Sequence, residues 1–142
     1  MKSLILAYTL AVAFSAVAAE KPDSAKVTGT VVTPKTVKDY SGLTLELRLY
    51  EYHPFIADKP AGLAAKLNFE EHTHKAGKEI KTQFALAVKI KPGMSYYITC
   101  FVIDAKGKRY LMGEKDGKRG LCKVLTGGNP NKVNLILRDL RK

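Results

Sequence analysis

The sequence lacks the residue patterns that most enzymes and membrane anchors need. It has only two cysteines and three histidines in 142 residues, and no cysteine lies near residue 20, where a bacterial lipoprotein would carry its lipid, so we expect no lipid anchor. Ser24, Ser41 and Ser95 lie in no nucleophile-elbow pattern. No histidine lies beside either sulfur in the sequence, and the carboxylates fall at strand ends and in loops. The sequence therefore predicts a protein that is not an enzyme and has no cofactor.

Acidic residues are scarce relative to basic ones. The chain has 24 Lys and Arg against 13 Asp and Glu, a formal net charge of +11. A basic exported protein can be drawn to anionic lipid head groups or to polyanionic cell-wall polymers. However, there is no block of five or more basic residues and no aromatic interleaving of the kind that binds nucleic acid. We therefore expect no nucleic-acid partner.

A long hydrophobic run occurs only at the N-terminus. Lys2 is followed by an apolar stretch from Leu4 to Val17, with small residues suited to signal peptidase at Ala16, Ala18 and Ala19. The stretch is shorter than the roughly 18 to 20 residues that span a bilayer. The sequence predicts a cleaved signal peptide over residues 1–19 and an exported, periplasmic or secreted, single domain over 20–142 with no transmembrane span. A retained signal anchor is the alternative.

The rest of the chain has no long helical periodicity but many short alternating segments. The clearest begins at Leu43, where four leucines alternate with Thr44, Glu46, Arg48 and Tyr50, as in a half-buried strand. Strands are predicted at residues 26–33, 43–52, 65–74, 80–90, 94–104, 109–113, 121–126 and 131–140.

Turn signals separate these segments, and only one short helical turn is expected. Gly29 indicates a bend or bulge in the first strand, and Asp58 and Pro60 predict a single helical turn over Leu63 to Lys66. Seven or eight short strands with turns between them favour two antiparallel sheets packed in a sandwich. A small closed barrel is the rival architecture.

The two cysteines are candidates for a disulfide. In an oxidising compartment a pair of cysteines in a small domain is more often bridged than free. A Cys100–Cys122 bond would tie the most apolar strand to the short strand that follows. Two separate buried thiols remain the alternative, because Cys100 alternates with core residues and a bridge needs the two Cα atoms within about 7 Å.

The pair His72 and His74 is the one candidate metal site. On a strand both imidazoles would share a face about 7 Å apart, with Glu70 on the same face. Together with Met94, Met112 or His53, such ligands suit copper or zinc. The alternative is a polar strand edge with no metal.

The order of the strands resembles a known envelope family. The segments KVTGTVV, LTLELRLYE, SYYITCFVIDAKGKRYLMG and KVLTGGNPNKVNLIL, within residues 26–138, resemble the YbaY-like envelope lipoprotein domain. That family is grouped with YscW, the lipoprotein chaperone (pilotin) of type III secretion. The resemblance implies an immunoglobulin-like antiparallel β-sandwich in the bacterial envelope, serving as a non-enzymatic binding or chaperone-like module. The missing lipidation cysteine means that lipid anchoring and delivery of a secretin are not implied.

Two functional hypotheses follow from the sequence. The first is a β-sandwich that binds another envelope protein, or a cell-wall polymer, through an exposed sheet face; Tyr97, Phe101 and Ile103 share one face of the most apolar strand and are its candidate residues. The second is a periplasmic copper- or zinc-binding protein that uses His72 and His74.

Overall fold

The computed structural model describes residues 24–140, which form eight strands and no helix. All eight predicted strands are present. Their bounds are β1 Ser24–Thr33, β2 Tyr40–Tyr52, β3 Gly62–His74, β4 Ile80–Lys89, β5 Ser95–Ile103, β6 Arg109–Lys115, β7 Cys122–Val124 and β8 Lys132–Asp139. The predicted signal peptide, residues 1–19, lies outside the described residues.

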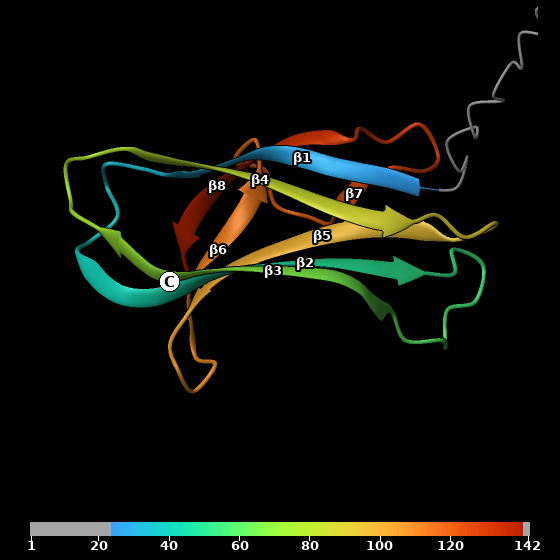
Figure 1. Ribbon diagram of the computed structural model, residues 1–142, viewed down its shortest axis with the longest axis horizontal. Helices are drawn as coiled ribbons and strands as arrows, with labels where there is room; N and C mark the ends of the chain where they lie inside the picture. The colour runs from blue at the N-terminus through green and yellow to red at the C-terminus, as the bar shows by residue number, and fades with distance from the viewer. Residues whose placement is uncertain (1–23, 141–142) are drawn as a thin grey trace, which may run out of the picture.

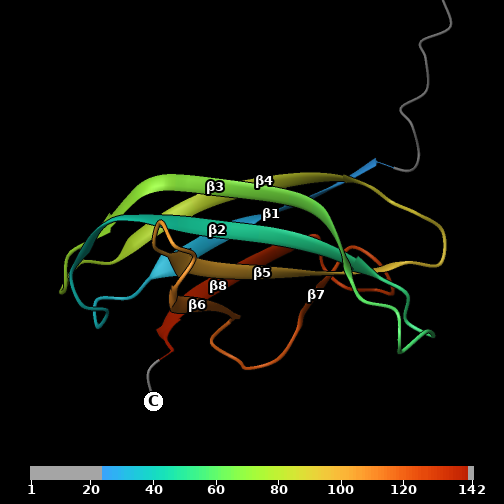
Figure 2. The ribbon, with the colours of Figure 1, turned by 90° about the horizontal axis from the view of Figure 1, so that it is seen from below.

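The strands form one continuous sheet in the order β3-β2-β5-β6-β8-β1-β4, with β7 paired to β5. The sheet coils until its two outer strands, β3 and β4, come close at the turn that joins them (Figure 1 and Figure 2). The all-β class is therefore confirmed. The immunoglobulin-like sandwich is not confirmed, because the sheet nearly closes on itself, as in the barrel that was the rival prediction.

One pair of strands departs from the predicted antiparallel arrangement. β1 and β8 run parallel, with Thr28 opposite Lys132 and Val32 opposite Ile136. Alternation of apolar residues reveals which face of a strand is buried but not the direction of its neighbour. The first and last strands of the chain thus lie side by side, although about a hundred residues separate them in the sequence.

The alternating residues build the core as their pattern predicts. Leu45, Leu47 and Leu49 of β2 are completely buried. They meet the inward face of β5 and the strands β1, β4 and β8 across the interior. The inner side chains of these other strands are Val27, Val31, Phe84, Leu86, Val88, Tyr96, Ile98, Cys100, Val102, Val133, Leu135 and Leu137.

Two local expectations from the sequence are wrong. Leu63 to Lys66 belong to β3 rather than to a helical turn. Gly29 does not bend β1, because the register with β4 continues through it. A Cβ atom at Gly29 would clash with the carbonyl oxygen of Val133, so this glycine allows the close approach of β1 to β8.

Candidate functional site: a cleft where the first strand leaves the last

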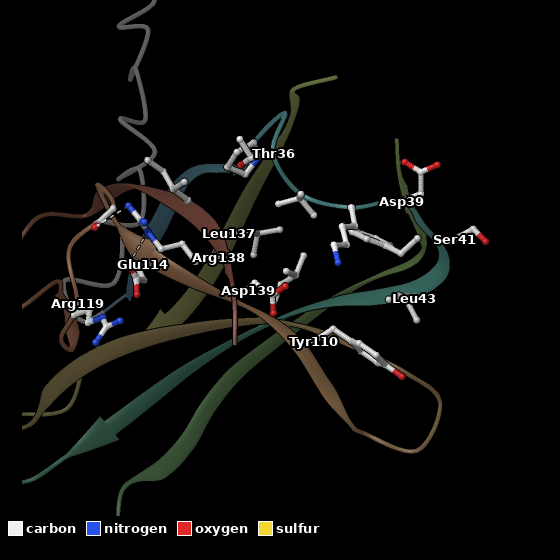
Figure 3. A pocket seen from close by; sticks show the side chains of 17 residues that line it. Thr36, Asp39, Ser41, Leu43, Tyr110, Glu114, Arg119, Leu137, Arg138 and Asp139 are labelled. Atoms are coloured by element: carbon white, nitrogen blue, oxygen red, sulfur yellow. Dashed lines mark hydrogen bonds and ion pairs between the residues drawn. The ribbon is translucent and has the colours of Figure 1, made fainter. Parts of the chain in front are cut away.

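A cleft of about 850 Å³ opens at one end of the sheet, between the β1–β2 loop (residues 34–39) and the ends of β6 and β8. Figure 3 shows Leu137 and Asp139 of β8 in the middle of the cleft, with Thr36 to one side and Tyr110 and Leu43 to another. The cleft is therefore formed by segments from both halves of the sequence.

The cleft is lined by an apolar floor and by charged residues of both signs. Its apolar lining comes from the loop and from β2, β6 and β8: Pro34, Val37, Leu43, Leu111, Ile136 and Leu137. Its charged lining has three basic residues, Lys38, Arg119 and Arg138, and three acidic ones, Asp39, Glu114 and Asp139. Glu114 is 7 % exposed and is paired with Arg138 at 2.8 Å. An apolar floor with balanced charges suits a peptide segment better than a highly charged polymer.

The cleft exists because Pro34 ends the ladder between β1 and β8. The N–H of Thr28 donates to the carbonyl of Asn131 at 2.9 Å, and in a parallel pair every second residue repeats this role. After Thr30 and Val32 the next residue in phase is Pro34, which has no N–H to donate to the carbonyl of Leu137.

Beyond that point the chain turns away from β8. The carbonyl of Pro34 accepts a hydrogen bond from the N–H of Val37 at 3.1 Å, which starts the loop. β8 continues to Asp139 alongside β6, whereas its register with β1 stops at Ile136. Leu137, Arg138 and Asp139 therefore line the cleft along a strand edge that β1 has left.

The loop that forms one wall of the cleft is tied to the β3–β4 turn (residues 75–79). The N–H of Gly77 donates to the carbonyl of Lys35 at 2.8 Å, and the N–H of Ala76 donates to Oδ1 of Asp39 at 2.6 Å. His74 lies beneath them, 1 % exposed. Its Nε2 lies 2.7 Å from the carbonyl of Lys78 and its Nδ1 lies 3.4 Å from that of Lys38.

The two predicted metal ligands lie inside the sheet rather than on a polar edge. Glu71 has a positive φ of 54°, and the register of β3 with β2 shifts between Phe69 and His72. This bulge turns His72 and His74 inward and leaves Glu70 outside. The predicted shared face of Glu70 with the histidines is therefore wrong.

His72 is held by Tyr40 rather than by a third ligand. The hydroxyl of Tyr40 lies 2.8 Å from Nδ1 of His72, and their rings stack at 5.7 Å. Nε2 of His72 is buried without a hydrogen-bond partner. Burial, with a smaller effect of His74, lowers the pKa of His72, and burial raises the pKa of Tyr40 to about 12. Among residues 24–140 no three His, Cys, Asp or Glu side chains cluster as metal ligands, so the metal site stays a prediction with two imidazoles and no closed ligand set.

Both cysteines are buried free thiols in the structure, and the predicted disulfide is not formed. Cys122 lies opposite Ile98 in the register, so Cys100 is its diagonal neighbour. Diagonal residues lie about 7–8 Å apart, beyond the usual span of a disulfide. Burial raises the pKa of both thiols, which makes them poor nucleophiles.

The predicted binding residues Tyr97, Phe101 and Ile103 lie on the outer face of β5, half-buried. The ring of Tyr97 stacks on Tyr50 at 5.1 Å, and the guanidinium of Arg109 covers Phe101 at 3.9 Å. The structure brings these three residues onto one face, but other side chains partly cover them.

Ion pairs cover the neighbouring part of the outer face, on β2 and β3. Glu46 is 5 % exposed and is paired with Arg48 at 2.7 Å and Lys66 at 3.1 Å. Burial raises the pKa of Glu46, but the hydrogen bonds and charges of Arg48 and Lys66 outweigh it, so the pKa is lowered. The outer face is thus a filled surface, whereas the cleft is hollow.

Sequence reasoning missed the cleft. Leu137 lies in the predicted strand 131–140 with nothing to mark it as a site residue, and the charged lining comes from four separate segments, two loops and two strands. Pro34, directly after a β-branched strand, was the one signal that could have located it, since proline interrupts a ladder.

Comparison with known proteins shows a shared fold. No protein-family model and no curated protein matches the chain. Among solved structures, the chain is similar to an alternative pilotin from the type II secretion system of Vibrio cholerae, with a TM-score of 0.53 and 21% sequence identity. The match covers 81% of this chain and 97% of that chain. Within residues 24–140 no helical segment has the length and apolarity needed to cross a membrane.

Proposed function

We propose that the protein is a non-enzymatic, chaperone-like module of the bacterial cell envelope that holds an extended segment of a secretin-type protein in its cleft. The observation that carries this proposal is the cleft beside the end of β8, where the strand runs on past its register with β1, which stops at Ile136, next to an apolar floor. Addition of a partner strand to such an edge is a common mode of peptide recognition, in which the backbone supplies hydrogen bonds and side-chain pockets supply specificity.

Two similarities support the choice of partner. The resemblance of residues 26–138 to the YbaY-like domain, grouped with the pilotin YscW, agrees with the fold shared with the Vibrio cholerae pilotin. We propose a periplasmic location, which the signal pattern over residues 1–19 also favours. The absence of a catalytic pattern fits a protein that binds and releases its partner without chemistry.

The test uses overlapping synthetic peptides that cover the secretin of the host organism. Binding of each labelled peptide to the purified protein is measured by fluorescence anisotropy. We expect one segment to bind, and Ile136→Asp, which places a charge in the cleft lining, to weaken that binding at least tenfold. Ile103→Asp on the outer face of β5 is the matched control and should bind like the wild type.

The mode of binding is tested on the bound peptide itself. Methylation of alternate backbone nitrogens removes donors from one edge of a strand only. We expect one set of alternate positions to abolish binding and the set shifted by one residue to preserve it. Loss of binding with Ile103→Asp but not Ile136→Asp would instead assign the partner to the outer face, and no bound segment at all would contradict the proposed function.

A further inference from the structure

The β2–β3 loop (residues 53–61) presents large apolar side chains to solvent. Phe55 is 89% exposed and Ile56 is 46% exposed, and Leu63, just after the loop, is 53% exposed. Among residues 24–140 only two other large apolar side chains, Leu121 and Leu140, are exposed. Both ribbon views place this loop at the end of the sheet where β1 begins and β4 ends (Figure 1 and Figure 2).

Two short turns hold the loop in this outward form. The N–H of Ile56 donates to the carbonyl of His53 at 3.3 Å, and the N–H of Lys59 donates to the carbonyl of Ile56 at 3.4 Å. The ring of His53 meets that of Phe55 edge-on at 6.3 Å. The apolar side chains therefore project from an ordered tip and do not fold back onto the core.

Behind the tip lies a group of tyrosines. Tyr52 closes β2, and its ring lies 5.7 Å from that of Tyr97, which stacks on Tyr50. All three are half-buried. A tyrosine has an apolar ring and a polar hydroxyl, which is why tyrosines gather where hydrocarbon meets water.

Basic side chains surround the same end. Lys59 lies in the loop, Lys91 is bound to Glu51 at 2.7 Å, and Lys123 lies opposite Tyr97 in the register. Lys89 ends β4 opposite Ser24. All four lysines are exposed, and Glu51 and Asp58 are the carboxylates beside the tip. The charge at this end is therefore positive, as is that of the whole chain.

We propose that the β2–β3 loop is a membrane-contact site, in which Phe55 and Ile56 enter the head-group region of an anionic lipid surface. The tyrosines would lie at the level of the head groups, and the lysines would meet the negative charge. This succession of apolar tip, tyrosines and lysines fits a lipid surface better than a protein groove, because the apolar residues protrude and no hollow surrounds them. The inference does not depend on the proposed function of the cleft.

The first experiment is sedimentation of the purified protein with two kinds of vesicle: pure phosphatidylcholine, and an equimolar mixture of phosphatidylcholine and phosphatidylglycerol. We expect binding to the mixed vesicles that weakens as salt is raised. The double variant Phe55→Ser/Ile56→Ser should partition at least tenfold less, because apolar burial contributes to such binding. Leu140→Ser, whose leucine is 41% exposed at the opposite end, should partition like the wild type.

A second experiment locates the contact. The chain contains no tryptophan, so Phe55→Trp introduces a single fluorescent reporter at the tip. Its emission should shift to shorter wavelength with the mixed vesicles, whereas that of Leu140→Trp should not. Unchanged emission of Phe55→Trp in the presence of bound vesicles would overturn the proposal.

Two further outcomes would also overturn it. One is a wild-type protein that stays in the supernatant with both vesicles. The other is a double variant that binds vesicles as the wild type does but fails to bind the secretin peptide, which would make the tip a protein contact. Because peptide binding is measured without lipid, failure of this inference is distinguishable from failure of the proposed function.

Discussion

The loops at the two ends of the sheet are held in place in different ways. At the cleft end, the β1–β2 loop is tied to the β3–β4 turn through Asp39, Gly77 and the buried ring of His74. At the other end, the β2–β3 loop is shaped by its own short turns and turns Phe55 outward. Contacts between loops keep one end hollow and ordered, whereas local turns leave the other end as a protruding tip. Substitutions at the first end should therefore affect stability, and those at the second should affect only what the tip contacts.

The largest expected difference in the free energy of unfolding is between His74→Ala and Phe55→Ser. Removing the buried His74 ring takes away the partner of the Lys78 carbonyl and opens a cavity, so we expect a loss of about 2–4 kcal/mol in the free energy of unfolding. Phe55→Ser should change it by no more than about 0.5 kcal/mol. Urea denaturation followed by circular dichroism measures both, and equal losses would show that the two ends are held alike.

A smaller difference is expected between two aspartates. Asp39→Ala removes the acceptor for the N–H of Ala76 and should cost about 1 kcal/mol, since the pair is exposed. Asp58→Ala, in the β2–β3 loop, should stay within about 0.5 kcal/mol of the wild type. Hydrogen exchange tests the hydrogen bond directly. The Ala76 amide should exchange faster in Asp39→Ala, and an unchanged rate would show that Asp39 does not hold this amide.

The smallest expected effect is a pH dependence at the cleft end. Burial, with a smaller effect of His74, lowers the pKa of His72 below its usual 6.5. The unfolded chain therefore takes up a proton at a higher pH than the folded chain, so stability present above about pH 6.5 is lost as the pH falls below that value.

Calorimetry at pH 7.5, 6.5 and 5.5 tests this dependence. The melting temperature of the wild type should fall with acidification more than that of His72→Gln, which can still bond to Tyr40. His53→Gln, in the β2–β3 loop, is the matched control and should keep the wild-type profile. Identical profiles for all three proteins would rule out His72 as the titrating group.

The strands could be predicted from sequence because their signal is local. The alternating leucines of β2 and the apolar face of β4 each fix a buried face within ten residues or so. The curvature of the sheet and the parallel pairing of β1 with β8 depend on contacts between distant segments, which alternation does not encode. The sequence alone therefore does not decide between a sandwich and a barrel.

The candidate site was harder to predict because single residues decide it. The bulge at Glu71 reverses the faces of His72 and His74, and a positive φ at a glutamate has no sequence signature. Pro34 breaks a ladder whose other strand, β8, begins about a hundred residues later. The diagonal placement of Cys100 and Cys122 likewise follows from a register that only the folded sheet reveals.

The pairing of β1 with β8 also sets the order in which the molecule can fold. Because β8 is the last strand of the chain, β1 can pair with β4 first, and its other edge is covered only when β8 joins the sheet. Until then the edge of β1 is open to any extended segment nearby. A chain that ends before Lys132 has no partner for that edge. The sheet is therefore complete only when the last strand has joined it.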